Sequence, residues 1–368
     1  MEVYIIFSII LFIFSFLEIF KLTKGKLKNV FLFVSFLGAV LIIGGRWYTG
    51  TDWFVYEYLF HESKSIDDVL EIWSTEIGYG ILTWLVRSVT DNYSVFLFIH
   101  AIIFYGLLIT SFKKIVPYPQ TAFFYYFLSN LGFVGSNRQL LGVVFLLFGI
   151  SFLLNENKKK FIILLISSFS FHATAYLGSV YFFLNRYLSK ITIILGILLA
   201  FAFGISPIPL KVFGSLGALS DHFMTKTEDY LSSAKSDAAS YGLTVMGAFK
   251  RLLFFFLFFA LREKLIPRFK NYNLFFNGYW VGILIYLFFS NSLTVMVSRG
   301  SLYFNLMECL LISSIFIILK KPTNKFLFLI IVYILGIVLM YQSIGGYPDL
   351  FDPYKGIWYN TDYFRKMH

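Results

Sequence analysis

The stretch from Arg46 to Trp53 combines groups that could do chemistry at the end of an apolar run. Arg46 and Asp52 lie six residues apart among aromatic side chains, directly after the apolar run Val30–Ile43. A guanidinium pairs with carboxylate or phosphate oxygens, and a carboxylate can accept a proton during a reaction. The alternative is an interfacial anchor, in which Arg46 extends toward water and the aromatic rings lie at headgroup depth. The arrangement of the other apolar runs bears on this choice.

Two further residues, Glu76 and His172, could also accept a proton. A carboxylate or an imidazole in a partly dry cavity is suited to taking the proton of an attacking hydroxyl. We therefore predict His172, Asp52 and Glu76 as candidate catalytic groups, with an ion pair, a helix cap or a buried hydrogen-bonded ring as the ordinary alternatives. No Cys, His and Asp cluster has the spacing of metal ligands, and no glycine-rich phosphate loop follows a strand, so no cofactor is expected.

The composition indicates a membrane protein. The chain has 368 residues, of which 58% are hydrophobic and 14% are charged, and its mean hydropathy is +0.75. Continuous apolar runs of about 16–20 residues are typical of membrane-spanning helices, and they exclude the alternating pattern of an outer-membrane barrel. The net charge of +11 lies mostly in short connectors, which the positive-inside rule explains better than binding to nucleic acid. The single cysteine, Cys309, excludes a disulfide framework.

These runs predict an all-α polytopic integral membrane protein with about 10–12 transmembrane helices, half-helices included, in one domain of residues 1–368. Ile77–Val89 is too short to cross, so we predict a half-span or an interfacial helix there. The runs expected to cross are Val3–Phe20, Asn29–Gly45, Ser94–Phe112, Thr121–Val134, Leu140–Leu154, Ile191–Ser206, Leu243–Leu261, Leu274–Ser290, Gly300–Leu319 and Phe326–Met340.

One run, Phe161–Leu184, is ambiguous because serines, His172 and Thr174 interrupt its middle. A single span would reverse every later connector, whereas a hairpin of two half-helices meeting near His172 keeps the lysine-rich connectors on one side. The positive-inside rule favours the hairpin and places those connectors in the cytoplasm. The outer parts are then residues 46–76, 207–242 and the C-terminal tail 341–368, and a capping box predicts a short helix starting near Thr225.

With this topology, most of the unusual polar residues lie at or near the outer face. Lys250 and Arg251 fall about eight residues into a span and so lie ~10 Å deep. Charges at such a depth are rare unless they face a cavity or a partner.

A set of short motifs follows in order along nearly the whole chain. They are Arg46-x3-Gly50-x-Asp52-x3-Tyr56, Glu76-x-Gly78, Arg138-Gln139, Phe171-His172, Arg299 and Pro353-Tyr354. Each motif is weak alone, but the ordered set resembles the EpsG family of Wzy-like polymerases of bacterial surface polysaccharides. Leu140-Leu141-Gly142 departs from the family pattern, in which an alanine is expected, and this affects packing more than chemistry.

The resemblance implies a fold like that of C-type glycosyltransferases, which use lipid-linked sugar donors and no metal ion. A polyprenyl-diphosphate donor keeps its diphosphate at the membrane surface, where planar guanidinium groups can pair with two phosphate oxygens. The residues expected to bind the diphosphate are Arg46, Arg138, Arg299, Lys250 and Arg251. The residues expected to contact sugar are Tyr56, Gln139, Tyr303 and Tyr354. The ordinary alternative for each is an interfacial anchor, an ion pair or a belt aromatic.

The resulting interpretation is a polymerase of the bacterial cytoplasmic membrane that joins polyprenyl-diphosphate-linked oligosaccharide repeats on the periplasmic or outer face. The product would be an O-antigen, a capsule or an exopolysaccharide, and inversion at the anomeric carbon is expected from the resemblance. The expected partners are the lipid-linked oligosaccharide, membrane lipid, a chain-length regulator and a flippase, with no nucleic acid. The alternatives are an O-antigen ligase, a membrane acyltransferase, or a lipid or polysaccharide transporter, although transporters more often show repeats and a polar path at the midplane.

Overall fold

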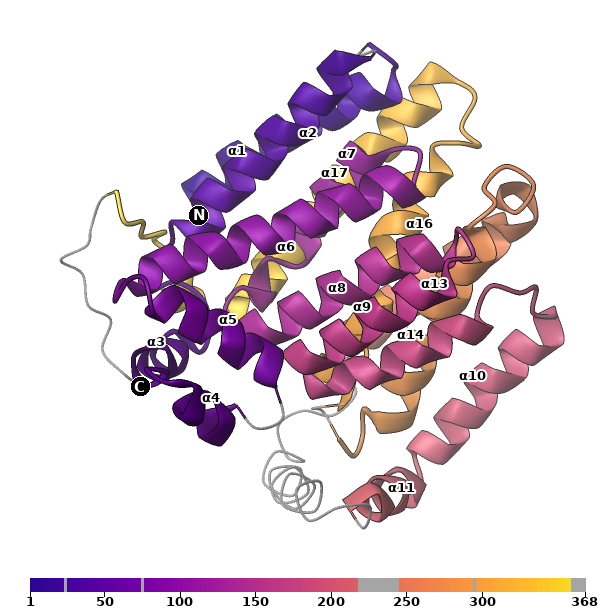
Figure 1. Cartoon of the computed structure of the whole chain (residues 1–368). Coiled ribbons are helices and arrows are strands. Elements are labelled where there is room, and N and C mark those ends of the chain that lie inside the picture. Colours follow the sequence, from indigo (N-terminus) through magenta and orange to yellow (C-terminus); the bar gives the residue numbers. More distant parts are fainter. Residues whose placement is uncertain (23–24, 74–75, 218–244, 294–295, 359–368) are drawn as a thin grey trace. The chain divides into compact units, whose positions relative to one another are not determined.

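The apolar runs fold into helices. The computed structural model describes residues 1–22, 25–73, 76–217, 245–293 and 296–358 of the chain (Figure 1). Within these ranges, five helical segments are long and apolar enough to cross a membrane, which confirms the predicted all-α polytopic class. They are α1 (Glu2–Ile19), α2 (Lys26–Ala39) with its π-helical continuation Val40–Gly44, α6 (Tyr93–Ile115), α14 (Tyr272–Phe289) and α17 (Pro322–Gly345).

Other helices occupy most of the remaining predicted spans. α8 (Asn137–Leu153) and α10 (Lys190–Gly204) are apolar, and α13 (Val245–Leu265) carries Lys250 and Arg251. The predicted span Gly300–Leu319 is divided into η4 (Met296–Gly300), α15 (Leu302–Asn305) and α16 (Met307–Ile315). The number of crossings, about 10–12, therefore stays a prediction.

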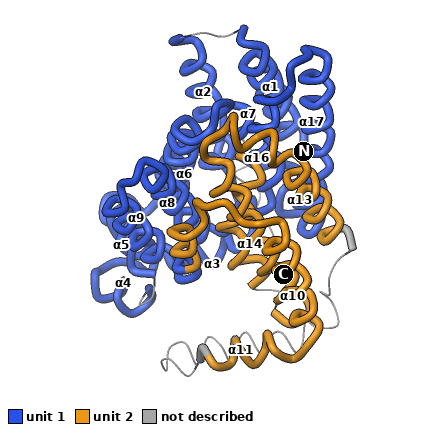
Figure 2. The backbone as a smooth tube through the Cα atoms, turned by 90° about the vertical axis from the view of Figure 1, so that its right-hand side faces the viewer, with its two compact units in different colours: residues 1–176, 312–368 blue, residues 177–311 orange. Residues whose placement is uncertain are grey.

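The chain forms two compact units (Figure 2). Unit 1 consists of residues 1–176 and 312–368, and unit 2 consists of residues 177–311. The chain thus leaves unit 1 after α9 (Lys158–Phe171) and returns to it within α16. The predicted integral domain of residues 1–368 is not tested by this division.

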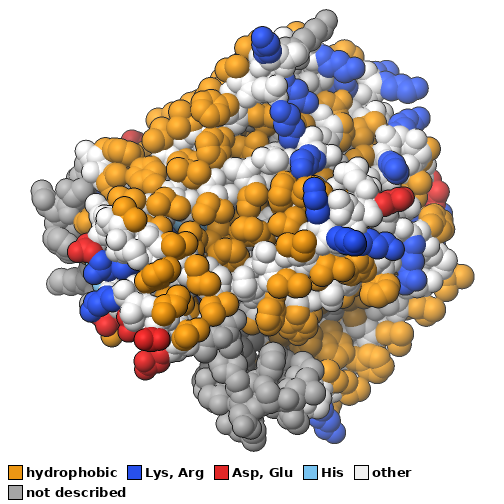
Figure 3. Space-filling view, in the orientation of Figure 1, with side chains coloured by type: hydrophobic (Ala, Val, Ile, Leu, Met, Phe, Trp, Pro, Cys, Tyr) orange, Lys and Arg blue, Asp and Glu red, His pale blue; other side chains and the backbone are white. Residues whose placement is uncertain are grey.

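The lysine-rich connectors of unit 1 gather at one end of its helices. Lys28 lies 3.5 Å from Glu18 at the end of α1, and that carboxylate accepts hydrogen bonds from the first backbone N–H groups of α7 (Pro119–Ser129). Lys114 and Lys160 both lie over the ring of Phe152, at 4.5 and 5.1 Å. Figure 3 shows several Lys and Arg side chains near the α1–α2 turn at the top, and others elsewhere on the same face. The cytoplasmic location of this end stays a prediction.

The opposite end of unit 1 is built from short helices and from the C-terminal segment. The predicted outer segment 46–76 forms α3 (Trp53–Glu62) and α4 (Ile66–Ile72), and the short run after it forms α5 (Ile77–Arg87). α17 extends to Gly345, five residues beyond the predicted end of that span, and η5 (Pro348–Leu350) follows.

The C-terminal segment then hydrogen-bonds to the stretch around Arg46. The N–H of Trp47 donates to the Lys355 carbonyl at 3.0 Å, and the N–H of Ile357 donates to the Gly45 carbonyl at 2.9 Å. The N–H of Gly50 donates to the Leu350 carbonyl at 3.1 Å. The segment predicted as an outer tail is therefore part of the structure that holds the Arg46 turn.

The ambiguous run breaks at the predicted residue. α9 ends at Phe171, His172 adopts an extended conformation, and the 3-10 helix η3 (Ala173–Phe183) follows. The helix break at His172 is confirmed, whereas the hairpin stays a prediction. In unit 2, α11 (Ile208–Gly217) occupies the start of the predicted loop 207–242, and the helix predicted near Thr225 lies outside the described residues.

Candidate active site

Three helix ends of unit 1 bring Arg138, Glu76 and His172 together. Glu76 directly precedes α5, Arg138 is the second residue of α8, and His172 directly follows α9. α8 packs along α9, and α5 packs on α9, so that these ends are neighbours. Helix ends leave backbone groups without intrahelical partners, and polar side chains are therefore tolerated there. Three predicted site residues from separate segments of the chain thus meet in one cluster, which we call the Arg138 cluster.

Arg138 is held by groups on three sides but remains partly open. Its Nε donates to the Tyr56 hydroxyl at 3.0 Å, and one terminal nitrogen forms an ion pair with Oε2 of Glu76. The guanidinium also lies over the rings of Tyr56 and Trp73, at 5.5 and 5.6 Å. The Arg138 side chain is 33% exposed, against 5% for Glu76. No hydrogen bond of its second terminal nitrogen is found among the described residues, so this nitrogen could donate to an anion.

The carboxylate of Glu76 also contacts the start of the segment after α9. Its Oε1 accepts a hydrogen bond from the backbone N–H of Ala173 at 3.3 Å and lies 3.8 Å from Nε2 of His172. On the other side of the ring, Nδ1 accepts from the Thr174 backbone N–H at 3.3 Å and lies 2.7 Å from the Thr174 hydroxyl. A backbone N–H can only donate, so a neutral ring carries its proton on Nε2, facing Glu76.

Tyr56 presents a neutral hydroxyl to this cluster. The residue is buried, and burial raises the pKa of the phenol, which the positive charge of Arg138 opposes in part. The hydroxyl therefore keeps its proton at neutral pH while it accepts from Arg138, and it can donate to a substrate oxygen.

Two glycines allow the backbone approaches that build the cluster. Gly135 has φ +114°, and a Cβ there would lie 2.1 Å from the carbonyl oxygen of Thr51. Across the same contact, the N–H of Thr51 donates to the Val134 carbonyl at 3.1 Å. At Gly78, a Cβ would lie 2.3 Å from the Ser170 hydroxyl, so this glycine lets α5 approach the end of α9. Gly78, from one of the sequence motifs, and Gly135, which belongs to none of them, therefore both serve packing around the site.

Arg46 occupies a different environment from that of Arg138. Its side chain is buried, at 2% exposure, and lies 5.8 Å from the Trp53 ring centroid. Its Nε donates to the Thr49 carbonyl at 3.2 Å, and its terminal nitrogens donate to the Ile43 carbonyl at 2.7 Å and to Asn137 Oδ1 at 3.0 Å. The predicted contact with a diphosphate stays untested, but this arrangement favours a role in holding Asn137, the neighbour of Arg138.

The other predicted site residues of unit 1 lie around these two arginines. Asp52 is exposed directly before α3, in a left-handed conformation with φ +55°. Gln139 is buried next to Arg138. Tyr354 is also buried, and its hydroxyl donates to the Ile42 carbonyl at 2.8 Å, which favours a packing role over sugar contact.

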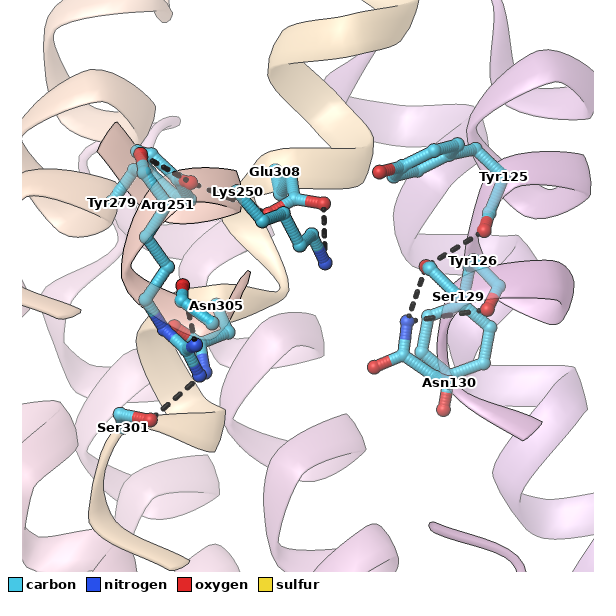
Figure 4. A network of polar contacts seen from close by, with 11 residues as sticks. Tyr125, Tyr126, Ser129, Asn130, Lys250, Arg251, Tyr279, Ser301, Asn305 and Glu308 are labelled. Atoms are coloured by element: carbon cyan, nitrogen blue, oxygen red, sulfur yellow. Dashed lines mark hydrogen bonds and ion pairs between the residues drawn. The ribbon is translucent and has the colours of Figure 1, made fainter. Parts of the chain in front are cut away.

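The remaining predicted residues belong to unit 2. Lys250 lies 3.2 Å from Glu308, and the Tyr279 hydroxyl donates to that carboxylate at 3.3 Å (left part of Figure 4). Arg251 lies over the Tyr286 ring at 4.2 Å and donates to the Gly247 carbonyl at 3.1 Å.

Arg299 and Tyr303 lie further along unit 2. Arg299 is exposed in the π-helical turn η4. Tyr303 is buried, and its carbonyl accepts from the Tyr181 hydroxyl at 2.9 Å. The predicted convergence of Arg46, Arg138 and Arg299 on one diphosphate is not tested, because unit 2 stands as a separate body.

A protein-family model supplies the decisive comparison, since the EpsG family model matches residues 29–355, which include all the predicted site residues. The chain belongs to the EpsG family. Membership indicates, at a coarse level, a multi-pass membrane protein of polysaccharide biosynthesis with a glycosyltransferase-like activity on a lipid-linked oligosaccharide. No curated protein and no solved structure matches the chain significantly.

In this EpsG-family protein, several contacts were not predicted from the sequence. Asn137 accepts from Arg46, donates to the Tyr93 hydroxyl at 3.3 Å, and pairs through its carbonyl with His100 Nε2 at 2.9 Å. Trp73 lies beside Arg138, and Glu308 pairs with Lys250. A carboxylate within an apolar run, as at Glu308, is a signal that could have been read. Among the described residues, no group of three or more His, Cys, Asp or Glu side chains could hold a metal ion.

Proposed function

We propose that this protein is a polymerase that joins polyprenyl-diphosphate-linked oligosaccharide repeats into a surface polysaccharide, at the outer face of the cytoplasmic membrane. The observation that carries the proposal is the Arg138 cluster, where a cation with an open donor, a buried carboxylate and an imidazole meet beside aromatic rings. A group transfer from a diphosphate to a sugar hydroxyl needs an anion-binding group and a base close together.

Arg138 is the group best suited to the diphosphate. Its free terminal nitrogen and partial exposure allow it to bind a phosphate oxygen while Glu76 and Tyr56 hold the other donors. The leaving diphosphate is a stable anion, so it needs charge stabilisation more than a proton. Arg46 acts through Asn137 rather than on the substrate.

His172 is the proposed base, with Glu76 as its partner. The acceptor hydroxyl oxygen forms a bond to the anomeric carbon while the bond from that carbon to the diphosphate oxygen breaks, and its electron pair leaves on the diphosphate. The hydroxyl proton passes to Nδ1 of His172. To reach this nitrogen, the acceptor hydroxyl takes the position that the Thr174 hydroxyl occupies in the structure. Glu76, which faces Nε2, then stabilises the imidazolium, as a carboxylate does in a hydrolytic triad. Attack opposite the leaving group inverts the anomeric carbon.

The test is a reconstituted reaction. Purified protein in proteoliposomes receives the polyprenyl-diphosphate-linked oligosaccharide, and longer glycans and released polyprenyl diphosphate are measured together. We expect wild-type protein to form both, and Glu76→Gln and His172→Gln to lower the rate by about 10²–10⁴-fold, because the base or its partner is lost. Binding of the donor is expected to persist, because Arg138 is retained.

Matched controls come from α3 of the same unit. Glu62→Gln and His61→Gln replace the same residue types outside the Arg138 cluster and should leave the rate unchanged. A wild-type rate in both Glu76→Gln and His172→Gln would exclude the proposed chemistry at this cluster. Transfer of the oligosaccharide to another class of acceptor would indicate a ligase. Movement of intact donor across the membrane without a new glycosidic bond would indicate a transporter.

A further inference from the structure

Arg262 is a buried cation without a hydrogen-bond partner. It lies in the last turn of α13 in unit 2, and its side chain is fully buried. None of its three guanidinium nitrogens has a hydrogen-bond partner in the described structure. Burying a charge without a partner is strongly destabilising, because its hydration is lost and nothing replaces it. Such a group needs an acceptor that the described residues do not supply.

Two aromatic rings surround this guanidinium but do not satisfy it. Arg262 lies 4.1 Å from the Tyr187 ring centroid and 5.5 Å from that of Phe276. A cation–π contact attracts the charge to the face of a ring, but it supplies no acceptor oxygen for the N–H groups. The rings interact with the positive charge, whereas the N–H groups still lack acceptor oxygens. Tyr187 is 57% exposed, so its ring can move aside without unpacking the interior.

An unsatisfied acceptor lies on α14, which packs against α13, at the residue that follows Phe276. Asn277 is fully buried, and its side-chain nitrogen donates to the carbonyls of Leu184 and Arg186, each at 2.7 Å. Its Oδ1 has no hydrogen-bond partner. Arg262 and Asn277 therefore both contact the segment 184–187, one through the Tyr187 ring and one through the backbone. A ligand that fits has anionic oxygens for Arg262 and a hydroxyl donor for Asn277.

The surroundings of Arg262 and Asn277 fit the inner surface of a membrane. Lys190, at the start of α10, lies 3.8 Å from Glu263, the neighbour of Arg262 in the chain. Arg268 is exposed just beyond α13, so further basic groups lie near the end of this helix. Apolar side chains, Ile191 at 71% and Phe256 at 60% exposure, continue along the same two helices. Basic pockets above an apolar helix surface are typical sites for anionic headgroups.

We propose that Arg262 and Asn277 bind the headgroup of an anionic phospholipid whose phosphate carries a hydroxylated alcohol, as in phosphatidylglycerol. The phosphate oxygens pair with the guanidinium, a headgroup hydroxyl donates to Asn277 Oδ1, and Tyr187 moves to admit them. The acyl chains lie on the apolar surfaces of α10 and α13. This site is independent of the Arg138 cluster and of the proposed polymerase activity.

The experiment measures thermal unfolding of the purified full-length protein in nanodiscs. One set contains phosphatidylcholine alone, and the other contains an equimolar mixture with phosphatidylglycerol. A lipid that binds only the folded state raises the unfolding midpoint. We expect this rise in wild-type protein and in Arg268→Gln, which removes an exposed arginine just beyond the same helix. The rise should be absent from Arg262→Gln and Arg262→Met.

The sign of the effect in neutral lipid gives a second check. Without an anionic lipid, Arg262→Met removes an unpaired buried charge, so its midpoint in phosphatidylcholine should equal or exceed that of wild type. A lower midpoint there would show that the chain already satisfies Arg262 and would overturn the proposal. An undiminished rise with phosphatidylglycerol in Arg262→Met would also overturn it. A rise of the same size with inorganic phosphate, lost in Arg262→Gln, would assign the site to a soluble anion instead.

Discussion

Arg46 donates to the Asn137 side chain, and Arg138 follows Asn137 in the sequence, yet the two arginines differ in exposure and in hydrogen bonding. Arg46 is buried, and its three nitrogens donate to the protein. Arg138 is one-third exposed and keeps one terminal nitrogen open beside a carboxylate and two aromatic rings. Their sequence contexts are similar, because each follows an apolar run and precedes another polar group. An arginine in a motif can therefore support a site indirectly, by holding the backbone and side chains next to it, as Arg46 holds Asn137.

Among the three substitutions that test this comparison, Arg46→Lys is expected to have the largest effect, which is on stability. Lysine keeps the charge but cannot donate in three directions to the carbonyls of Ile43 and Thr49 and to Asn137. With two hydrogen bonds to a charged group lost, the free energy of unfolding should fall by about 3 kcal/mol. Denaturation of purified protein measures this. Activity per folded molecule should remain measurable, and unchanged stability with abolished polymerisation would make Arg46 a substrate ligand.

The next effect is on activity, from Arg138→Lys. The planar donor set that reaches Tyr56, Glu76 and a phosphate is lost, while the charge stays. Loss of a charge-assisted pair is worth about 1.5–3 kcal/mol, so polymer synthesis should fall roughly ten- to a hundredfold at normal protein levels. Arg87→Lys is the matched control, since Arg87 pairs with Asp91 at the end of α5. Polymer at wild-type rates from Arg138→Lys would show that the Arg138 guanidinium does not bind the diphosphate.

The smallest effect is expected from Tyr56→Phe. This change removes the acceptor for Arg138 Nε without altering the ring that packs against the guanidinium. One hydrogen bond contributes about 0.5–1.5 kcal/mol, so the rate should fall roughly two- to tenfold. Tyr58→Phe, on the exposed side of the same helix, provides the control and should leave initial rates intact. Equal effects of the two substitutions would show that the Tyr56 hydroxyl does not position Arg138.

The sequence predicted the parts of the molecule that depend on local pattern. Apolar runs indicated the helices, the polar interruption at His172 indicated the end of α9, and the short run after Glu76 indicated a short helix. The motif order indicated the EpsG family, which the family comparison confirms. These features depend on hydrophobic periodicity and residue type, which are visible within a single segment.

The contacts between distant segments could not be predicted in the same way. Nothing in the sequence near Asn137 shows that it joins several helices rather than only starting α8. Its partners Arg46, Tyr93 and His100 come from other elements. Tyr354 was predicted to contact sugar, but its hydroxyl is used by the Ile42 carbonyl. The break of one predicted span into η4, α15 and α16 depends on tertiary packing that overrides an apolar run.

The hydrogen bonds between residues 45–50 and 350–357 set an order on the biogenesis of the protein. Translation and membrane insertion proceed from the N-terminus, so the Arg46 turn enters the membrane long before Leu350 and Lys355 have been made. Until α17 has inserted, that turn lacks three of its backbone partners. Nascent chains that stop short of α17 therefore carry every helix of the Arg138 cluster and still lack the segment that hydrogen-bonds to the neighbouring Arg46 turn.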